Sequence, residues 1–159
     1  MIVCYSKTGK TRVFAEELSK LTGMKLFELA EERPHEGFFG NLRGAWEAVR
    51  GKEAKVKELP DLAGVRKIFV CSPIWAGSVA PAARYFMNHA DLTGVEVNFL
   101  TTCANPGGCR KYADDALAAF AASGKNGVPG AAYGFVTAGK KPVDREAIRE
   151  QMQKMITDR

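Results

Sequence analysis

Five short apolar runs, separated by longer stretches of helical period, dominate the pattern of this sequence. The runs are MIVCY (1–5), MKLFEL (24–29), KIFVCS (67–72), VEVNFLTT (95–102) and AAYGFVTA (131–138). Between them apolar side chains recur every three or four residues, as at Phe14, Leu18 and Leu21. Several runs are apolar on both faces, which is typical of parallel strands covered by helices on both sides. The sequence therefore predicts an α/β fold, a doubly wound three-layer sandwich around a five-stranded parallel sheet.

The length and the apolar content favour a single domain over residues 1–159. The 159 residues include 46% apolar side chains, enough to bury one core. No apolar run approaches the roughly 20 residues that a membrane-spanning helix needs, and strand-like residues begin at Met1 without a leader pattern. We therefore expect a cytoplasmic protein without a membrane span.

The charge does not indicate a nucleic-acid partner. The formal charge is +5, but the Lys and Arg residues are spread along the chain among 18 acidic residues. Charge that is spread in this way usually belongs to a solvated surface, so no nucleic acid is predicted as a partner.

The four cysteines are Cys4, Cys71, Cys103 and Cys109. They lack the paired C-x-x-C spacing of a zinc site, so no metal is predicted. Cys103 and Cys109 flank a short loop and can pair if folding brings their Cα atoms within about 7 Å. A cytosolic setting favours thiols instead, and we expect all four to be free.

The stretch TGKT (8–11) resembles the end of a Walker phosphate loop, but the rest of that motif is missing. A Walker loop needs G-x-x-x-x-G-K-[ST], and the position of its first glycine is occupied by Cys4. The C-x5-R loop of phosphotyrosine phosphatases is also disfavoured, because Lys10 stands where the arginine fork is needed. What remains is a strand-to-helix turn rich in hydroxyls, which suits a terminal monophosphate such as that of FMN.

Three loops of the chain resemble the cofactor loops of flavodoxin-like proteins. The pattern S-x-T-G-x-T at residues 6–11 is similar to their phosphate-binding loop. SPIWAGSVAPAARYF (72–86) is similar to their second flavin loop, and TTCANPGGC (101–109) is similar to their third. The three motifs follow three predicted strands in the right order. The resemblance implies FMN as cofactor and a sheet order of 2-1-3-4-5.

This resemblance assigns a role to each loop: the first holds the FMN phosphate, the second lines the flavin ring, and the third approaches its pyrimidine edge. The implied cofactor-binding residues are Ser6, Lys7, Thr8, Gly9, Lys10, Thr11, Ser72, Pro73, Ile74, Trp75, Ala76, Gly77, Thr102, Cys103, Ala104, Asn105, Gly107 and Gly108. No side chain is expected to be catalytic, because the chemistry would take place on the flavin. The third loop lacks the aromatic residue that electron-carrier flavodoxins commonly have there, which leaves one flavin face open to a substrate.

Some of these residues also have simpler interpretations. Trp75 is either a flavin contact, which we favour, or an ordinary core aromatic. Asn105 is either a ligand contact or a turn former. The least regular connection contains Phe38, Phe39 and Trp46, which form either a helix face or a lid or partner surface, and a homodimer through them is a further possibility. His35 and His89 receive no catalytic role.

The resemblance implies an FMN-dependent oxidoreductase that passes electrons from NAD(P)H to a quinone or a similar small-molecule acceptor. The alternative is a non-enzymatic carrier that shuttles electrons between redox protein partners, and a weaker one is a flavodoxin-like interaction protein without flavin. The second and third loops carry no charge, and Arg110, Lys111, Lys140 and Lys141 follow nearby. Negative charges near the ring would repel a reduced flavin, and these loops have none. This favours two-electron turnover and thus the enzyme.

Overall fold

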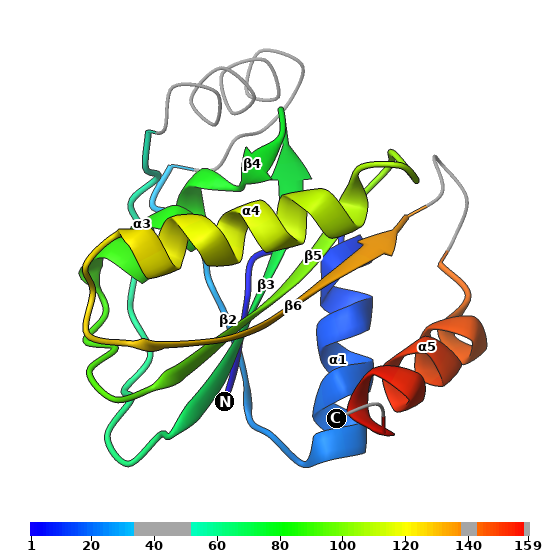
Figure 1. Ribbon diagram of the computed structural model, residues 1–159, viewed down its shortest axis with the longest axis horizontal. Coiled ribbons are helices and arrows are strands. Elements are labelled where there is room, and N and C mark those ends of the chain that lie inside the picture. The colour runs from blue at the N-terminus through cyan, green and yellow to red at the C-terminus, as the bar shows by residue number, and fades with distance from the viewer. Residues whose placement is uncertain (34–51, 138–142, 158–159) are drawn as a thin grey trace.

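Five parallel strands form one sheet in the order β2-β1-β3-β5-β6 (Figure 1). This computed structural model describes residues 1–33, 52–137 and 143–157. The parallel strands are β1 (Ile2–Cys4), β2 (Leu26–Glu28), β3 (Lys67–Trp75), β5 (Glu96–Cys103) and β6 (Val128–Val136). Counted along the chain as parallel strands, they confirm the predicted doubly wound sheet and its order 2-1-3-4-5.

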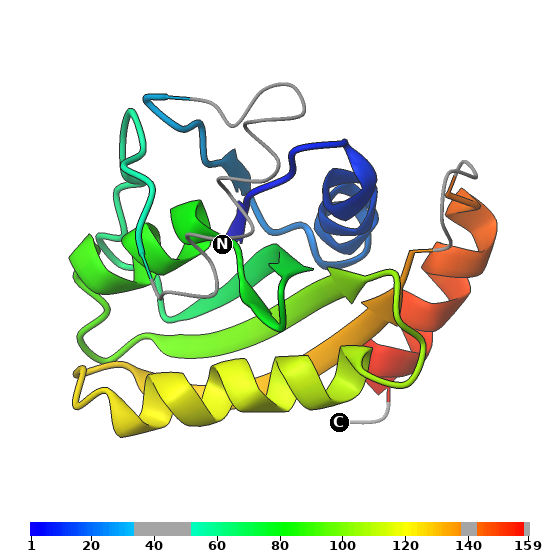
Figure 2. The same ribbon diagram turned by 90° about the horizontal axis from the view of Figure 1, so that it is seen from above.

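Helices cover both faces of this sheet, and Figure 2 shows α1 and α4 on opposite sides of it. The described helices are α1 (Lys10–Thr22), α3 (Pro81–His89), α4 (Cys109–Ala122) and α5 (Arg145–Thr157). Phe14 of α1 and Met152 of α5 belong to one buried cluster, whereas Phe86 of α3 and Phe120 of α4 belong to the other. None of the helices described is long and apolar enough to cross a bilayer.

The central strands explain why the apolar runs are continuous. In β3, Ile68 and Val70 join the cluster under α3 and α4, while Phe69 and Cys71 join the cluster under α1 and α5. Successive side chains of a strand point to opposite faces, so a strand covered on both sides is largely apolar along its length.

Two strand boundaries differ from the predicted ones by three residues, and the others by at most two. β3 continues to Trp75 instead of ending at residue 72, because Pro73 still pairs with β5 and Trp75 pairs with the short antiparallel strand β4 (Ser78–Val79). β6 begins at Val128 instead of residue 131, because Val128 pairs with Glu96 at the start of β5. The sequence did not indicate β4, which is only two residues long.

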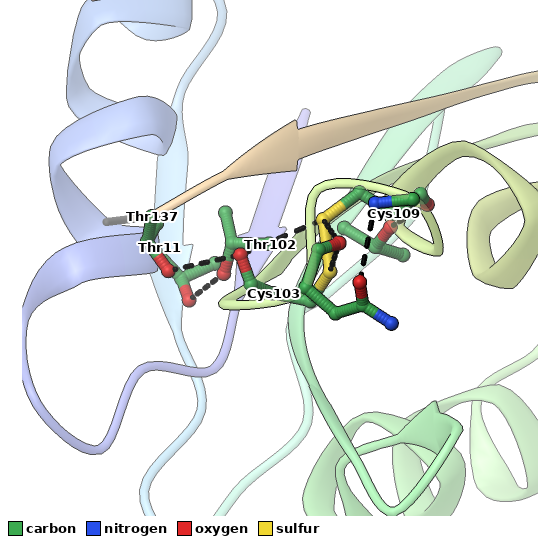
Figure 3. Close-up of a disulfide and its surroundings, with 8 residues drawn as sticks. Thr11, Thr102, Cys103, Cys109 and Thr137 are labelled. Carbon is green, nitrogen blue, oxygen red and sulfur yellow. Dashed lines mark hydrogen bonds between the residues drawn. A yellow bond between two sulfur atoms is a disulfide. The ribbon is translucent and has the colours of Figure 1, made fainter. Parts of the chain in front are cut away.

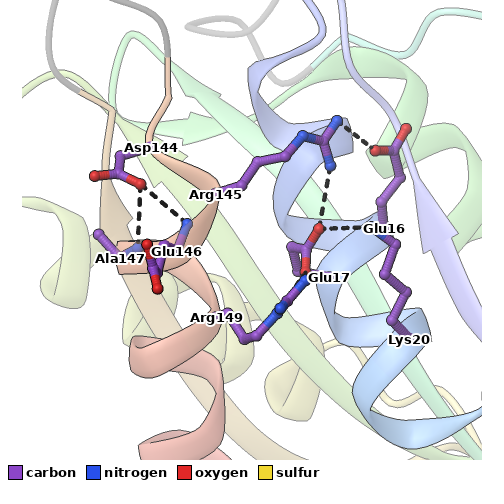
Figure 4. Close-up of polar contacts among 8 residues, drawn as sticks. All are labelled: Glu16, Glu17, Lys20, Asp144, Arg145, Glu146, Ala147 and Arg149. Atoms are coloured by element: carbon purple, nitrogen blue, oxygen red, sulfur yellow. Dashed lines mark hydrogen bonds and ion pairs between the residues drawn. The ribbon is translucent and has the colours of Figure 1, made fainter.

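A buried carboxylate joins α5 to α1 (Figure 4). The side chain of Glu17 is 0% exposed and forms ion pairs with Lys20 at 2.8 Å, Arg145 at 3.1 Å and Arg149 at 3.1 Å. Asp144 precedes α5 and accepts the backbone N–H groups of its first turn, at 3.0 and 3.3 Å. The ion pairs fix the C-terminal helix against the helix that follows the first loop.

Several predictions concern residues outside the part of the chain that the structure describes. These residues are His35, Phe38, Phe39, Trp46, Lys140 and Lys141. The lid, the partner surface and the homodimer therefore remain predictions.

Candidate functional site

The three loops singled out in the sequence lie at one edge of the sheet (Figure 1). Parallel strands end at the same edge, so the residues after β1, β3 and β5 are brought together there. Two contacts show this proximity. The Thr11 and Thr102 hydroxyl oxygens are 2.8 Å apart, and the Lys7 Nζ lies 5.6 Å from the centre of the Trp75 ring.

The first loop leads into the N-terminus of α1 and contains a buried hydroxyl that forms no hydrogen bond with the described residues. Gly9 adopts φ 79°, a left-handed conformation that suits glycine, and no side chain caps the helix. The Ser6 hydroxyl oxygen is buried, and no described residue forms a hydrogen bond with it. Leaving a buried hydroxyl unpartnered costs about 1–3 kcal/mol, so this loop is suited to an anion with several acceptor oxygens.

Thr11, one of the predicted phosphate contacts, lies deeper than the others. Its side chain is 2% exposed and that of Thr102 is 3% exposed, and their hydroxyls form a buried hydrogen bond (Figure 3). Thr8, in contrast, lies exposed on the loop. The structure thus places Thr11 and Thr102 beneath the site, where they tie the first loop to the third.

The second loop is a tight hairpin between β3 and β4. Ala76 adopts φ 48° and Gly77 adopts φ 84°, the two positive values that a type I′ turn requires. For a side chain larger than glycine this conformation costs on the order of 1 kcal/mol, and such strain is often found at functional sites. The hairpin presents Ala76 and Gly77 as its exposed tip.

Trp75 stands where the first and second loops meet. Its ring packs edge-on against Tyr5, with 5.8 Å between the ring centres, and Lys7 lies over the same indole. Trp75 also packs against the core cluster, yet it remains only partly buried. The core interpretation therefore applies to Trp75, and its contact with a flavin stays a prediction that its partial exposure allows.

Tyr5 stays neutral and holds Trp75 from below. Burial raises the pKa of the Tyr5 phenol well above its usual value, and the charge of Glu31 and a hydrogen bond with it raise the pKa further. Because the phenol is neutral and buried, Tyr5 contributes by packing and not as an acid or a base.

Ser72 lies behind the hairpin rather than on it. Its side chain is 0% exposed, and its hydroxyl accepts from the Ala80 N–H at 3.0 Å and donates to the Pro73 carbonyl oxygen at 2.9 Å. These bonds connect β3 to the start of α3. Pro73 and Ile74 also lie within β3, so the loop itself is shorter than predicted.

The third loop satisfies two of its own amides. The Gly107 N–H donates to the Asn105 side-chain oxygen at 3.1 Å, and the Gly108 N–H donates to the Asn105 carbonyl oxygen at 3.2 Å. Asn105 therefore forms the turn, and its contact with a ligand stays a prediction. A ligand that takes hydrogen bonds from these two amides must displace Asn105 from them.

Cys103 and Cys109 form a disulfide, so the prediction of free thiols was wrong for this pair (Figure 3). Their Cα atoms are 5.7 Å apart, within the range that a disulfide spans. Gly134 allows the start of α4 to pack closely against β6, because a Cβ at Gly134 would lie 2.2 Å from the Cys109 carbonyl oxygen. Cys4 and Cys71 are free and buried, as predicted.

Tyr112 is a site residue that the sequence pattern did not reveal. A Cβ on Gly108 would lie 2.6 Å from its ring, and a Cβ on Gly77 would lie 3.5 Å from it. The Tyr112 ring therefore supports both the second and the third loop. The periodicity of the sequence had shown only that this residue belongs to a helix face.

The cations after the third loop are paired along α4. Arg110 pairs with Asp114 at 3.1 Å and Lys111 pairs with Asp115 at 2.6 Å, four residues further along the helix in each case. Their positive charge is therefore partly neutralised, whereas Lys7 lies over Trp75 at the loops.

A cavity of about 380 Å³ lies on the other side of the hairpin, between α3 and α4. Gly77, Arg84, Tyr112 and Phe120 are among the residues that line it, and no first-loop residue is among them. This cavity therefore adjoins the second loop at Gly77 but does not include the first loop.

No model of a known protein family matches the chain, and no curated protein matches it either. Several solved structures are similar to it. A candidate flavoprotein from Bacteroides uniformis has a TM-score of 0.74 at 18% identity, with 97% of each chain covered. A flavoprotein from Lactobacillus acidophilus in complex with FMN has a TM-score of 0.67 at 19% identity, covering 85% of this chain and 90% of that one. A flavodoxin from the domain Archaea has a TM-score of 0.55 at 12% identity, covering 99% and 96%. At these identities the likeness is one of fold, and the chain has the flavodoxin-like fold.

Proposed function

We propose that this chain binds FMN at the three loops and passes electrons from NAD(P)H through it to a quinone or a similar small-molecule acceptor. The observation that carries the proposal is the buried Ser6 hydroxyl without a partner, beside a helix N-terminus that no side chain caps. The solved flavoprotein in complex with FMN has the same fold, which adds support to the choice of ligand.

The first loop would hold the phosphate. The backbone N–H groups at the start of α1 and the Ser6 hydroxyl supply donors, and the positive end of the helix favours an anion. Thr8 and Lys10 lie on the same turn. A monophosphate needs no metal to bind in such a loop, because neutral donors and one or two cations suffice.

The hairpin and the third loop would hold the ring. Trp75 offers a partly exposed indole that packs against Tyr5, and the Tyr112 ring packs against both loops. Bound FMN supplies the two-electron chemistry, and the chain contributes binding and orientation.

The charge at the loops favours the enzyme over the electron carrier. The residues of the three loops, 5–9, 76–77 and 104–108, include no Asp or Glu. Lys7 adds a positive charge beside Trp75. Such surroundings do not repel a reduced, anionic ring, and they attract the phosphates of NAD(P)H.

Two measurements test this function in sequence. Flavin-free protein is first titrated with FMN, and the quenching of FMN fluorescence is followed. NAD(P)H oxidation by the loaded protein is then measured with and without a quinone. We expect tight binding and quinone-dependent oxidation. Binding without any NAD(P)H oxidation would favour the electron carrier, and failure to bind FMN would refute the proposal.

A further inference from the structure

The disulfide between Cys103 and Cys109 closes the third loop at its base. Cys103 is the last residue of β5 and Cys109 is the first residue of α4, so the bond joins a strand end to a helix N-terminus. Residues 104–107 between them are exposed, whereas the two cysteines are 8% and 2% exposed. The disulfide is thus placed directly under the segment that the proposed function assigns to the flavin.

We propose that this pair is a second redox site of the protein, a reversible disulfide that accepts two electrons from a dithiol reductant by attack at Cys103. Cys103 is the more exposed of the two sulfur-bearing residues. Cys109 is the better leaving group, because the N–H groups at the start of α4 stabilise a thiolate there. A sulfur that leaves as a stabilised thiolate makes exchange at its partner faster.

The exchange balances in two steps. A thiolate of the reductant attacks the Cys103 sulfur, the Cys103–Cys109 bond breaks, and the Cys109 sulfur leaves with the bonding electrons and takes up a proton. The second thiol of the reductant loses its proton and attacks the reductant's own sulfur in the mixed disulfide, whose bond to the Cys103 sulfur breaks. The Cys103 sulfur leaves as a thiolate and takes up a proton, and the reductant becomes a disulfide.

The loop already contains acceptors for both thiols of the reduced state. The Cys103 sulfur lies 3.1 Å and the Cys109 sulfur 3.3 Å from the Asn105 carbonyl oxygen. A thiol on each residue can therefore donate to this oxygen with little movement. The reduced pair fits the same loop, which is what a reversible couple requires.

The same carbonyl oxygen connects the redox state to the shape of the loop. Asn105 accepts there from the Gly108 N–H, so thiols formed on reduction compete for the acceptor that holds Gly108 in its turn. Reduction also opens the covalent ring that fixes the loop ends. A loop that is less ordered beforehand binds a ligand more weakly, because ordering it costs entropy on binding. FMN is therefore expected to favour the oxidised form, a step that rests on the proposed function.

The remaining cysteines serve as internal controls. Cys4 and Cys71 are 1% and 0% exposed. Burial raises the pKa of the Cys4 thiol to about 12 and that of Cys71 well above its usual value, so neither forms a thiolate readily.

The first experiment uses the flavin-free protein and does not depend on FMN. The protein is equilibrated in buffers of reduced and oxidised dithiothreitol, and alkylation with mass spectrometry counts the thiols at each cysteine. We expect Cys103 and Cys109 to become modified together, reversibly and with the circular dichroism of the fold unchanged, while Cys4 and Cys71 stay unmodified. Reduction that occurs only when the fold is lost would overturn the proposal.

The attacked sulfur is located on the unmodified protein. Brief reaction with reduced glutathione, quenching in acid and peptide mass spectrometry should find glutathione on Cys103 and a free thiol at Cys109. Glutathione mainly on Cys109, or equally on both residues, would contradict attack at Cys103.

The second experiment measures the link to FMN. We expect reduction to weaken FMN binding about tenfold, and reciprocity then requires FMN to lower the reduction potential of the disulfide by about 30 mV. The Cys103→Ser/Cys109→Ser variant should bind as weakly as the reduced protein and should not respond to dithiol. Equal affinity in both redox states would refute the link. Absence of FMN binding in both states would refute the proposed function and leave the first experiment to decide on the redox site.

Discussion

The Thr11 and Thr102 hydroxyl oxygens lie 2.8 Å apart and form a hydrogen bond that is buried from solvent. Thr11 belongs to the first turn of α1 and Thr102 to the end of β5. A single buried hydrogen bond thus joins the loop assigned to a phosphate to the strand that carries the disulfide. The two loops are expected to move as one unit.

Removing both of these hydroxyls should cost less than the sum of the two single removals. Thr102→Val leaves the Thr11 hydroxyl buried without its partner, which should lower the free energy of unfolding by about 1–3 kcal/mol. The double variant Thr11→Val/Thr102→Val has no hydroxyl left unpaired and should lose less than the sum of the single variants. Urea unfolding of the four proteins measures this. Strict additivity would mean that the two hydroxyls do not interact.

Gly134 should tolerate no side chain. Gly134→Ala brings a Cβ to within 2.2 Å of the Cys109 carbonyl oxygen and 2.5 Å of the Arg110 nitrogen, both of them backbone atoms of the first turn of α4. The start of this helix must then move away from β6, and we expect a loss of about 2 kcal/mol or more in unfolding free energy.

Gly107→Ala is the matched control for this substitution. Its Cβ would lie 3.7 Å from the nearest atom, an ordinary contact, so stability should change by only about 0.5 kcal/mol. Equal melting temperatures for Gly134→Ala and the unmodified protein would contradict the close approach of α4 to β6.

Acid should weaken the link between α1 and α5. The hydrogen bond from Lys20 is the largest influence that lowers the pKa of Glu17 from 4.5 to about 2; burial opposes the shift, and Arg149 and Arg145 add to it. A lowered pKa stabilises the fold above the unfolded value of 4.5, and this stabilisation is lost as the pH falls towards about 2.

Glu17→Gln isolates this effect, because the variant cannot titrate at this position. Between about pH 6 and pH 3 the unmodified protein should lose about 1–2 kcal/mol more unfolding free energy than the variant, allowing for the half-exposed cations. Parallel pH profiles of urea stability in the two proteins would show that the ion pairs contribute no net stability.

The fluorescence of Trp75 should report FMN binding. Its indole is partly exposed beside the first loop, so a bound flavin ring within contact distance should quench it. Trp46→Phe removes the other tryptophan, so that the signal comes from Trp75 alone. Emission that does not change as FMN binds to this variant would place the ring away from Trp75.

The fold was predictable because strands that are buried on both faces are rich in apolar residues, and each strand shows this in its own sequence. β3 is apolar from Ile68 to Cys71, and β5 carries Val97, Phe99 and Leu100, a pattern that is visible without knowing what covers the strands. The hairpin was not visible, since β4 has two residues and depends on positive φ values at Ala76 and Gly77.

The site was predicted less completely than the fold. The three loops were found from their motifs, but Tyr112 and Gly134 matter only because distant segments approach them closely. The disulfide was missed because the expected cytosolic compartment favoured free thiols. The close approach of Cys103 and Cys109 depends on how α4 packs against β6, which the sequence does not show. The pairing of Lys111 with Asp115 follows the four-residue spacing of a helix and could have been predicted from the sequence.

The most direct test compares the affinities for FMN and riboflavin, which differ only in the phosphate. The account predicts riboflavin binding at least about 100-fold weaker than FMN binding, because several hydrogen bonds to a charged group are lost. Ser6→Ala should weaken FMN binding about tenfold and leave riboflavin binding unchanged, because only the phosphate accepts from this hydroxyl. The control Ser19→Ala, whose hydroxyl donates to the Met24 carbonyl oxygen at the far end of α1, should affect neither ligand. Equal affinities for FMN and riboflavin, or an unchanged FMN affinity in Ser6→Ala, would contradict the placement of the phosphate in the first loop.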